Sequence, residues 1–226
     1  MDKTKIVFAA KCAPDENTLS TIWDAGLIGI ELYTDSLWMK KIPQIIKSCK
    51  HFPFRYAIHA PTDTTFQSEA LAGLTAEIQA EIVVFHNVFW DDEWEEIQRS
   101  FDKSPAKLCI ENHNNVNEPI KFMRRFGMGR CLDLEHLQME VGGVFEEEFV
   151  RVMKTACHVH MSGYSIGTES WHTPIHQAAK HSTYLLNLLQ RAEYKGMVVS
   201  EARVSYQTQE EFTQLHVFTQ NWLTRQ

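Results

Sequence analysis

Acidic and imidazole side chains recur where short apolar runs of this sequence end. Seven of them stand at the end of a β-type run or directly after it: Glu31, His59, His86, Glu111, Asp133, His160 and Glu201. Carboxylates and imidazoles are the groups with which proteins bind divalent metals and transfer protons. Their regular recurrence predicts one site that is assembled from the ends of many strands.

The apolar runs themselves have the composition of buried strands. Runs such as IVVF and MVV are too apolar for strands with one wet face, and they suit a parallel sheet that is covered by helices. The first seven runs begin 23 to 27 residues apart, which is the span of one strand, one helix and two loops, and the eighth follows after 40. The eight predicted strands are Lys5–Ala9, Gly29–Leu32, Tyr56–His59, Ile82–His86, Leu108–Glu111, Cys131–Asp133, Cys157–Met161 and Met197–Glu201.

Amphipathic segments between these runs predict helices. They are Glu16–Ala25, Leu37–Cys49 with a helix start at Pro43, Phe145–Met153 and Thr183–Ala192. The acidic cluster that begins at Asp91 predicts a further helix start, because acidic groups are favoured at that end of a helix. Alternating strands and helices indicate an α/β fold with right-handed crossovers.

Eight strand–helix units favour a closed (β/α)₈ TIM barrel, and we expect residues 1–226 to form it as a single compact domain. The rival architecture is an open doubly wound sheet, which calls for a Gly-rich phosphate turn after its first strand. The chain reads AAKCAPDE there and has no such turn. The barrel is therefore the preferred prediction.

Composition narrows the class of protein. A hydrophobic content of 44% in 226 residues is enough for a full core, and a net charge of −7 argues against a nucleic-acid partner. The five cysteines are an odd number without a CxxC pair, which favours reduced thiols and a reducing compartment. No run has the length of a signal peptide or a membrane span. The expectation is a soluble, cytoplasmic protein that needs no membrane.

The carboxyl ends of barrel strands converge on one mouth, so the strand-end residues should form a cluster. Alternation along a strand places His158 and His160 on the same face, with His160 nearer the mouth. For His158, a hydrogen-bonded core histidine and a residue that supports the site from behind are both open. Converging carboxylates require a counter-charge, and Arg203 is the cationic side chain that we expect near them. A divalent metal ion (Mn, Zn, Co, Fe or Mg) is the predicted solution.

A set of short motifs follows in order along the whole chain: IHAP around His59, the strand-end His86, IEN around Glu111, LDLEH around Asp133 and His136, HVHMSG around His160, His172, and SEAR around Glu201. In this ordered set the sequence resembles the xylose isomerase-like TIM barrels, the superfamily of sugar isomerases and epimerases that also includes the endonuclease IV-type DNA-repair enzymes. Each motif is weak alone, whereas the ordered set is specific for the superfamily and does not name a member.

The resemblance implies a metal-dependent isomerase or epimerase that acts on a small sugar or keto-sugar. One divalent ion would be held by Glu111, Asp133, His160 and Glu201. Glu111 and Glu201 would also transfer protons on opposite faces of the substrate, through a metal-stabilised enediolate. The residues expected to bind substrate are His59, His86, His136, His172, Trp171 and Arg203, with Trp171 on a long loop that could act as a lid. A homo-oligomer is compatible with the sequence.

Two alternatives stay open. The first is an endonuclease IV-type zinc phosphodiesterase, because His59, His86, His136 and His172 also fall where that branch has further zinc ligands. Against it, Ser170 stands where that branch has an aspartate, and the compact, negatively charged chain has little with which to hold DNA. The second is a metal-free binding barrel. One ion would indicate isomerase chemistry, and two or three ions that include His59 and His86 would indicate hydrolase chemistry.

Overall fold

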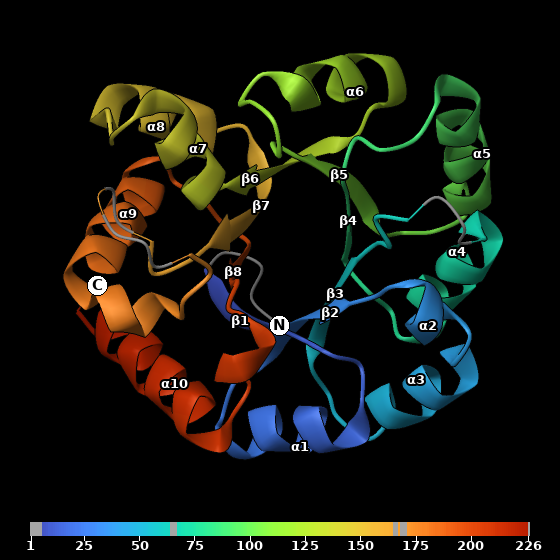
Figure 1. The fold of residues 1–226 in the computed structure, drawn as a ribbon, viewed down its shortest axis with the longest axis horizontal. Helices are drawn as coiled ribbons and strands as arrows, with labels where there is room; N and C mark the ends of the chain where they lie inside the picture. The colour runs from blue at the N-terminus through green and yellow to red at the C-terminus, as the bar shows by residue number, and fades with distance from the viewer. Residues whose placement is uncertain (1–5, 64–66, 165–166, 168–170, 226) are drawn as a thin grey trace.

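Eight parallel strands close into a barrel in the computed structural model, which describes residues 6–63, 67–164, 167 and 171–225 (Figure 1). Each strand pairs with the next one along the chain, and β1 pairs with β8 to complete the ring. The predicted TIM barrel is therefore confirmed. The strands are β1 (Val7–Cys12), β2 (Gly29–Tyr33), β3 (Arg55–His59), β4 (Ile82–Phe85), β5 (Lys107–Glu111), β6 (Gly129–Asp133), β7 (Ala156–Met161) and β8 (Met197–Ser200).

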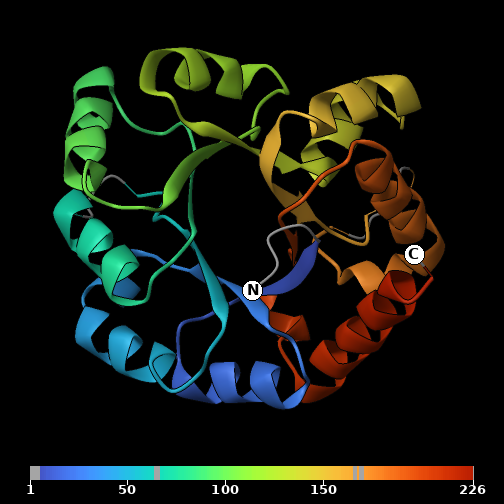
Figure 2. The same ribbon diagram turned by 180° about the vertical axis from the view of Figure 1, so that it is seen from behind.

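Helices surround this barrel on the outside, as the views from the two ends show (Figures 1 and 2). The last helix lies beside the first, so the two ends of the chain complete the outer ring. The helices are α1 (Glu16–Asp24), α2 (Ser36–Met39), α3 (Ile42–Cys49), α4 (Ser68–Glu77), α5 (Asp91–Phe101), α6 (Glu118–Phe126), α7 (Leu134–Val141), α8 (Glu146–Met153), α9 (Ala179–Arg191) and α10 (Gln209–Leu223), with 3₁₀ turns η1 (Ile175–Ala178) and η2 (Val204–Tyr206). In the described part of the chain, no helix is long and apolar enough to cross a membrane.

Two predicted elements differ from the observed ones in ways that matter for the site. The segment predicted as one helix from Leu37 is split into α2 and α3, with Pro43 in the first turn of α3, as the helix start at that proline indicated. The first strand was predicted to end at Ala9, but β1 continues to Cys12. This extension carries one further inward-facing residue, Lys11, to the mouth of the barrel.

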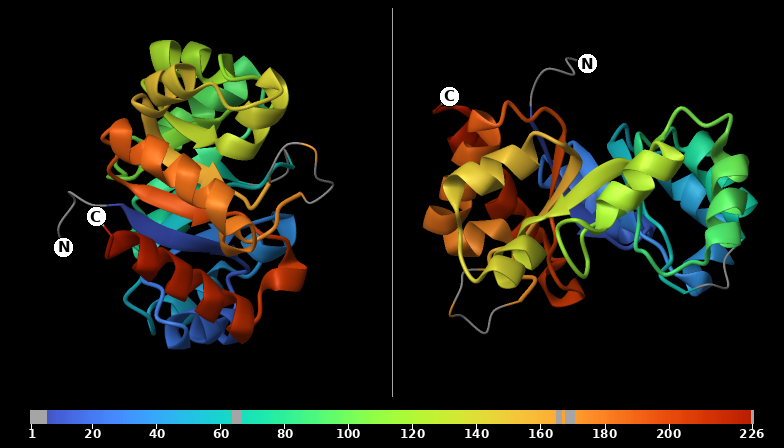
Figure 3. Two further views of the ribbon diagram at one scale, coloured as in Figure 1. Left: turned by 90° about the vertical axis from the view of Figure 1, so that its left-hand side faces the viewer. Right: turned by 90° about the horizontal axis from the view of Figure 1, so that it is seen from above.

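The core has two layers, because successive strand residues point alternately outward and inward. Outward residues such as Ile30, Val83 and Val198 pack against the helices in one large apolar cluster. The inside of the barrel holds smaller groups, in which small or thiol side chains such as Ala9 and Cys131 are buried. The side views in Figure 3 show the strands enclosed between the helices. Inward residues one step nearer the mouth are the polar ones described below.

Gly129 lies at a tight point inside the barrel. A Cβ added there would lie 2.8 Å from the sulfur of Cys157 and 2.9 Å from that of Cys109, two of the five free cysteines. Gly129 pairs with Cys109 across the β5–β6 register. The absence of a side chain at this position is what lets the two thiols fill the interior.

We expect Gly129→Ala to lower the free energy of unfolding by about 1–3 kcal/mol, because the new methyl group overpacks a closed interior. Urea unfolding followed by circular dichroism measures this. Gly73→Ala is the matched control: nothing lies within 4 Å of an added Cβ in the middle of α4. It should gain up to about 1 kcal/mol from helix propensity. Equal stability of the Gly129→Ala variant and the wild type would contradict the packing argument.

Candidate active site

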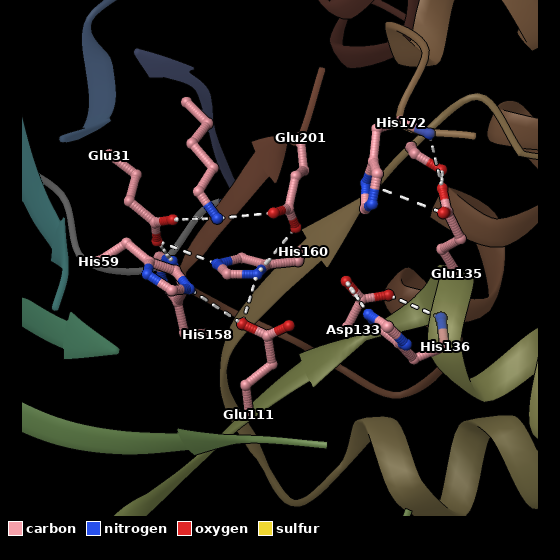
Figure 4. A network of polar contacts seen from close by, with 12 residues as sticks. Glu31, His59, Glu111, Asp133, Glu135, His136, His158, His160, His172 and Glu201 are labelled. Carbon is pink, nitrogen blue, oxygen red and sulfur yellow. Dashed lines mark hydrogen bonds and ion pairs between the residues drawn. The ribbon is translucent and has the colours of Figure 1, made fainter. Parts of the chain in front are cut away.

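Four side chains from the carboxyl ends of the last four strands meet in the mouth of the barrel (Figure 4). Glu111 and Asp133 end β5 and β6, His160 is near the end of β7, and Glu201 follows β8. One ligand atom from each lies within 4.8 Å of those of the others. The structure thus brings together the four residues that the sequence analysis grouped as metal ligands.

His160 lies in the middle of this cluster. Its Nδ1 is 3.2 Å from Glu111 Oε2 and 3.1 Å from Glu201 Oε2, and it is fully buried. Burial alone would lower the pKa of His160, but the Cys131 thiol and the surrounding carboxylates outweigh it and raise the pKa well above its ordinary value. In the metal-free protein, His160 is therefore a buried cation that holds the two glutamates together.

Lys11 is a second cation in the mouth, and the sequence analysis did not predict it. Its Nζ lies 2.6 Å from Glu201 Oε1 and 3.6 Å from Glu31 Oε1. Burial acts to lower the pKa of Lys11, but Glu201 and Glu31 raise it well above the ordinary value, so the ammonium group stays charged. The sequence analysis named only Arg203 as a cation near the strand ends and missed Lys11, because β1 is longer than predicted and Lys11 faces inward.

Glu31 supports the site from behind. It is fully buried on β2, and its Oε2 lies 2.7 Å from His158 Nε2 and 3.0 Å from His160 Nε2. Burial would raise the pKa of Glu31, but both imidazoles and Lys11 hold it well below the ordinary value. An ionised carboxylate only accepts hydrogen bonds, so both histidines donate through Nε2. Both roles that were left open for His158 therefore apply. It is a hydrogen-bonded core histidine, and it orients the Glu31 carboxylate, which in turn contacts His160.

The environment of the Asp133 carboxyl group disfavours its ionised form. Burial, together with the nearby carboxylates of Glu201 and Glu111, raises the pKa of Asp133 well above its ordinary value. Its Oδ1 accepts a hydrogen bond of 2.8 Å from the backbone N–H of His136 and so caps α7. His136 therefore lies in the first turn of α7, because β6 runs directly into this helix.

The imidazoles of His59 and His86 lie on the other side of Glu111. The Nε2 atom of each is 3.3 Å from Glu111 Oε2, and the three residues form a second group with metal-ligand spacing. A third imidazole, His113, stacks on His86 with ring centroids 4.8 Å apart. The sequence analysis assigned no role to His113.

His172 lies at the rim of the mouth and pairs with Glu135, away from His160 (Figure 4). Its Nδ1 is 3.8 Å from Glu135 Oε1, and its backbone N–H donates to Glu135 Oε2 over 3.1 Å. Glu135 is buried and also accepts a hydrogen bond from Ser162. Trp171, the predicted lid residue, is partly exposed and stacks on Tyr164 with ring centroids 5.2 Å apart. Ser170 lies outside the described residues.

A cavity of about 240 Å³ opens beside Glu201. Arg203, which follows β8, borders it, and its backbone N–H donates to the carbonyl of His172 over 2.9 Å. The guanidinium of Arg203 makes no ion pair with any acid in the described part of the chain. The side chains that line the cavity include Lys11, Tyr33, His172, Glu201, Arg203 and Gln207.

Comparison with solved structures finds the same barrel in proteins of low sequence identity. A 3-keto-D-glucoside 4-epimerase, YcjR, from E. coli superposes with a TM-score of 0.65 at 13% identity, covering 96% of this chain and 100% of that one. D-allulose 3-epimerase from Methylomonas sp. gives 0.65 at 11%, over 97% and 98% of the two chains. The TTHB071 protein from Thermus thermophilus, soaked with ZnCl₂, gives 0.66 at 16%, over 96% and 98%. The chain therefore has the same eight-stranded barrel fold as these proteins. No family model and no curated protein matches the sequence.

We expect Glu31→Gln to lower the pKa of the His160 imidazole by about 1–3 units, because it removes a buried anion that favours the charged ring. Long-range ¹H–¹⁵N NMR titration of the metal-free protein measures the pKa directly. Glu135→Gln serves as the control, because it replaces a buried carboxylate with an amide but does not contact His160. An unchanged His160 pKa in Glu31→Gln would contradict the coupling.

Proposed function

We propose that the protein is a divalent-metal-dependent isomerase or epimerase that acts on a small sugar or keto-sugar. The observation that carries the proposal is the placement of two glutamates, the buried Glu111 and the partly buried Glu201, within 3.2 Å of the same nitrogen of His160, with Asp133 beside them. Two barrels of the same fold, YcjR and D-allulose 3-epimerase, are sugar epimerases by name.

The mouth suits a divalent ion. Glu201 Oε2 and His160 Nδ1 are buried, and neither has a hydrogen-bond partner of good geometry among the described residues. Both are atoms that ligate metals, and buried polar atoms without a partner are costly. The donor set of Glu111, Asp133, His160 and Glu201 would hold Mn, Zn, Co, Fe or Mg. When bound, such an ion would stabilise, as a Lewis acid, the negative charge that develops on the substrate oxygens.

The two glutamates divide the proton transfer between them. One carboxylate removes a proton from a substrate carbon next to a carbonyl group, and the other returns a proton to the opposite face, so the configuration of that carbon inverts. Lys11 remains beside Glu201 as a fixed positive charge. On the far side, His59 and His86 are positioned to donate hydrogen bonds to substrate hydroxyl groups.

The cavity beside Glu201 limits the size of the substrate. Its volume of about 240 Å³ is below the roughly 300–1,000 Å³ of sites for drug-sized ligands, which favours a single sugar unit over a polymer. The guanidinium of Arg203 would bind a substrate oxygen at its edge. Trp171 and Tyr164, stacked at the rim, would help to exclude water.

A second candidate function, zinc-dependent phosphodiester hydrolysis, is favoured by one observation. His59, His86 and Glu111 form a second ligand group next to the first, as a two-metal hydrolase would require. The net charge of −7 disfavours it, because DNA binding depends on cations that neutralise phosphates. We therefore rank the isomerase first.

Glu201→Gln should reduce epimerisation by about 10²–10⁴-fold, because the amide cannot take or return a proton. Exchange of the substrate C–H proton with D₂O, followed by NMR on D-allulose and on 3-keto-glucosides, measures the step itself. Glu77→Gln is the control, because Glu77 is exposed and paired with Lys50 far from the mouth. Unchanged exchange in Glu201→Gln would remove Glu201 from the mechanism.

Metal removal provides an independent test. We expect chelation with EDTA to abolish proton exchange and Mn²⁺ or Zn²⁺ to restore it, with at least one divalent ion per chain found by elemental analysis. Full activity without metal would contradict the proposal. Incision of abasic-site DNA by the zinc-loaded protein, without sugar epimerisation, would instead support the hydrolase.

A further inference from the structure

One wall of the mouth is a row of imidazoles in which His113 has no role in the proposed mechanism. His113 is exposed in the segment between β5 and α6, two residues after Glu111. Its ring stacks on that of His86, with centroids 4.8 Å apart and planes 20° apart, and contacts that of His136 at a centroid distance of 5.0 Å. The His113 ring therefore contacts both His86, which follows β4, and His136, which lies in α7.

These side chains have the spacing of metal ligands. One nitrogen each of His113 and His136 and one carboxylate oxygen of Glu111 lie within 4.8 Å of one another. Two histidines and a glutamate are a ligand set of catalytic zinc sites, which keep a fourth position open. The ion-pair contacts of Glu111 with His59, His86 and His160 all involve Oε2, so Oε1 is the oxygen left for this group.

The charge balance of the mouth favours a second cation. The four acids Glu31, Glu111, Asp133 and Glu201 face one lysine, Lys11. With neutral histidines, a single divalent ion would therefore leave one negative charge without compensation. Asp133, a member of the first ligand group, also approaches the second one, because its Oδ2 is 4.0 Å from His136 Nε2.

We propose that Glu111, His113 and His136 form a second transition-metal site, selective for ions of the Zn²⁺ type, beside the Glu111–Asp133–His160–Glu201 group. The proposal rests on the proposed function in that it takes the latter group as the first metal site. Glu111 would be shared by the two sites. With three protein ligands, the second ion would keep a position for a water molecule or a substrate oxygen.

The test counts bound zinc in the full-length protein after metal removal. Wild type, His113→Gln and His51→Gln are titrated with Zn²⁺ by calorimetry, and bound zinc is measured by elemental analysis. His51 is the matched control, because it is an exposed histidine whose ring pairs with Glu16 and takes no part in the mouth. We expect two ions for wild type and His51→Gln, and the loss of one ion in His113→Gln.

Two results would overturn the second site: a single ion in wild type, or two ions retained in His113→Gln. A further arm, His59→Gln, separates it from the neighbouring group of His59, His86 and Glu111. We expect His59→Gln to keep both ions, and loss of the second ion in His59→Gln but not in His113→Gln would assign it to that group instead. Zinc is counted without substrate, so the outcome does not depend on whether the protein epimerises sugars.

Discussion

The structure depends on keeping several carboxylates charged inside an apolar barrel. An ionised group loses several kcal/mol when it leaves water, unless partners replace the solvent. Glu31 and Glu111 are both almost completely buried. The protein compensates them with cations from other strands: His160 lies between Glu31 and Glu111, and Lys11 lies between Glu31 and Glu201. Closure of the barrel is what makes this compensation available, because it brings β1 next to β8 and directs β2 and β7 into the same interior.

The barrel is divided along its axis into an apolar floor and a charged mouth. Alternation places Cys109 directly below Glu111 on β5 and Cys131 directly below Asp133 on β6, with one outward residue between each pair. The lower residues are small enough to pack the interior, since Gly129 makes room for two thiols. This packed floor excludes water beneath the carboxylates and strengthens each electrostatic interaction above it. The stability of the floor and the chemistry of the mouth are therefore properties of the same strands.

The sequence predicted the parts of the site that local pattern determines. Strand periodicity identified eight strands, and the polar residue at the end of each run located Glu111, Asp133, His160 and Glu201. The sequence pattern could not place Lys11 in the mouth, because the end of β1 is fixed by pairing with β2 and β8 rather than by local composition. Pairing of Glu31 with two histidines more than a hundred residues away is likewise a property of barrel closure. The segment after β7, where the predicted lid lies, carries no periodic pattern from which its conformation could be read.

The two sides of the mouth differ in charge. This difference separates substrate binding, on the Glu201 side, from the binding of a second metal ion, on the Glu111 side. On the Glu201 side, Lys11 donates a hydrogen bond to Oε1 of Glu201, and the cavity that Arg203 borders opens next to this pair. A second metal ion on that side would be repelled by two fixed cations, whereas oxygen atoms of a substrate would be attracted. On the Glu111 side, imidazoles take the place of cations, and neutral imidazoles are metal ligands. Substrate binding is thus favoured at one glutamate and additional metal binding at the other, so a sugar and a second ion could occupy the mouth together.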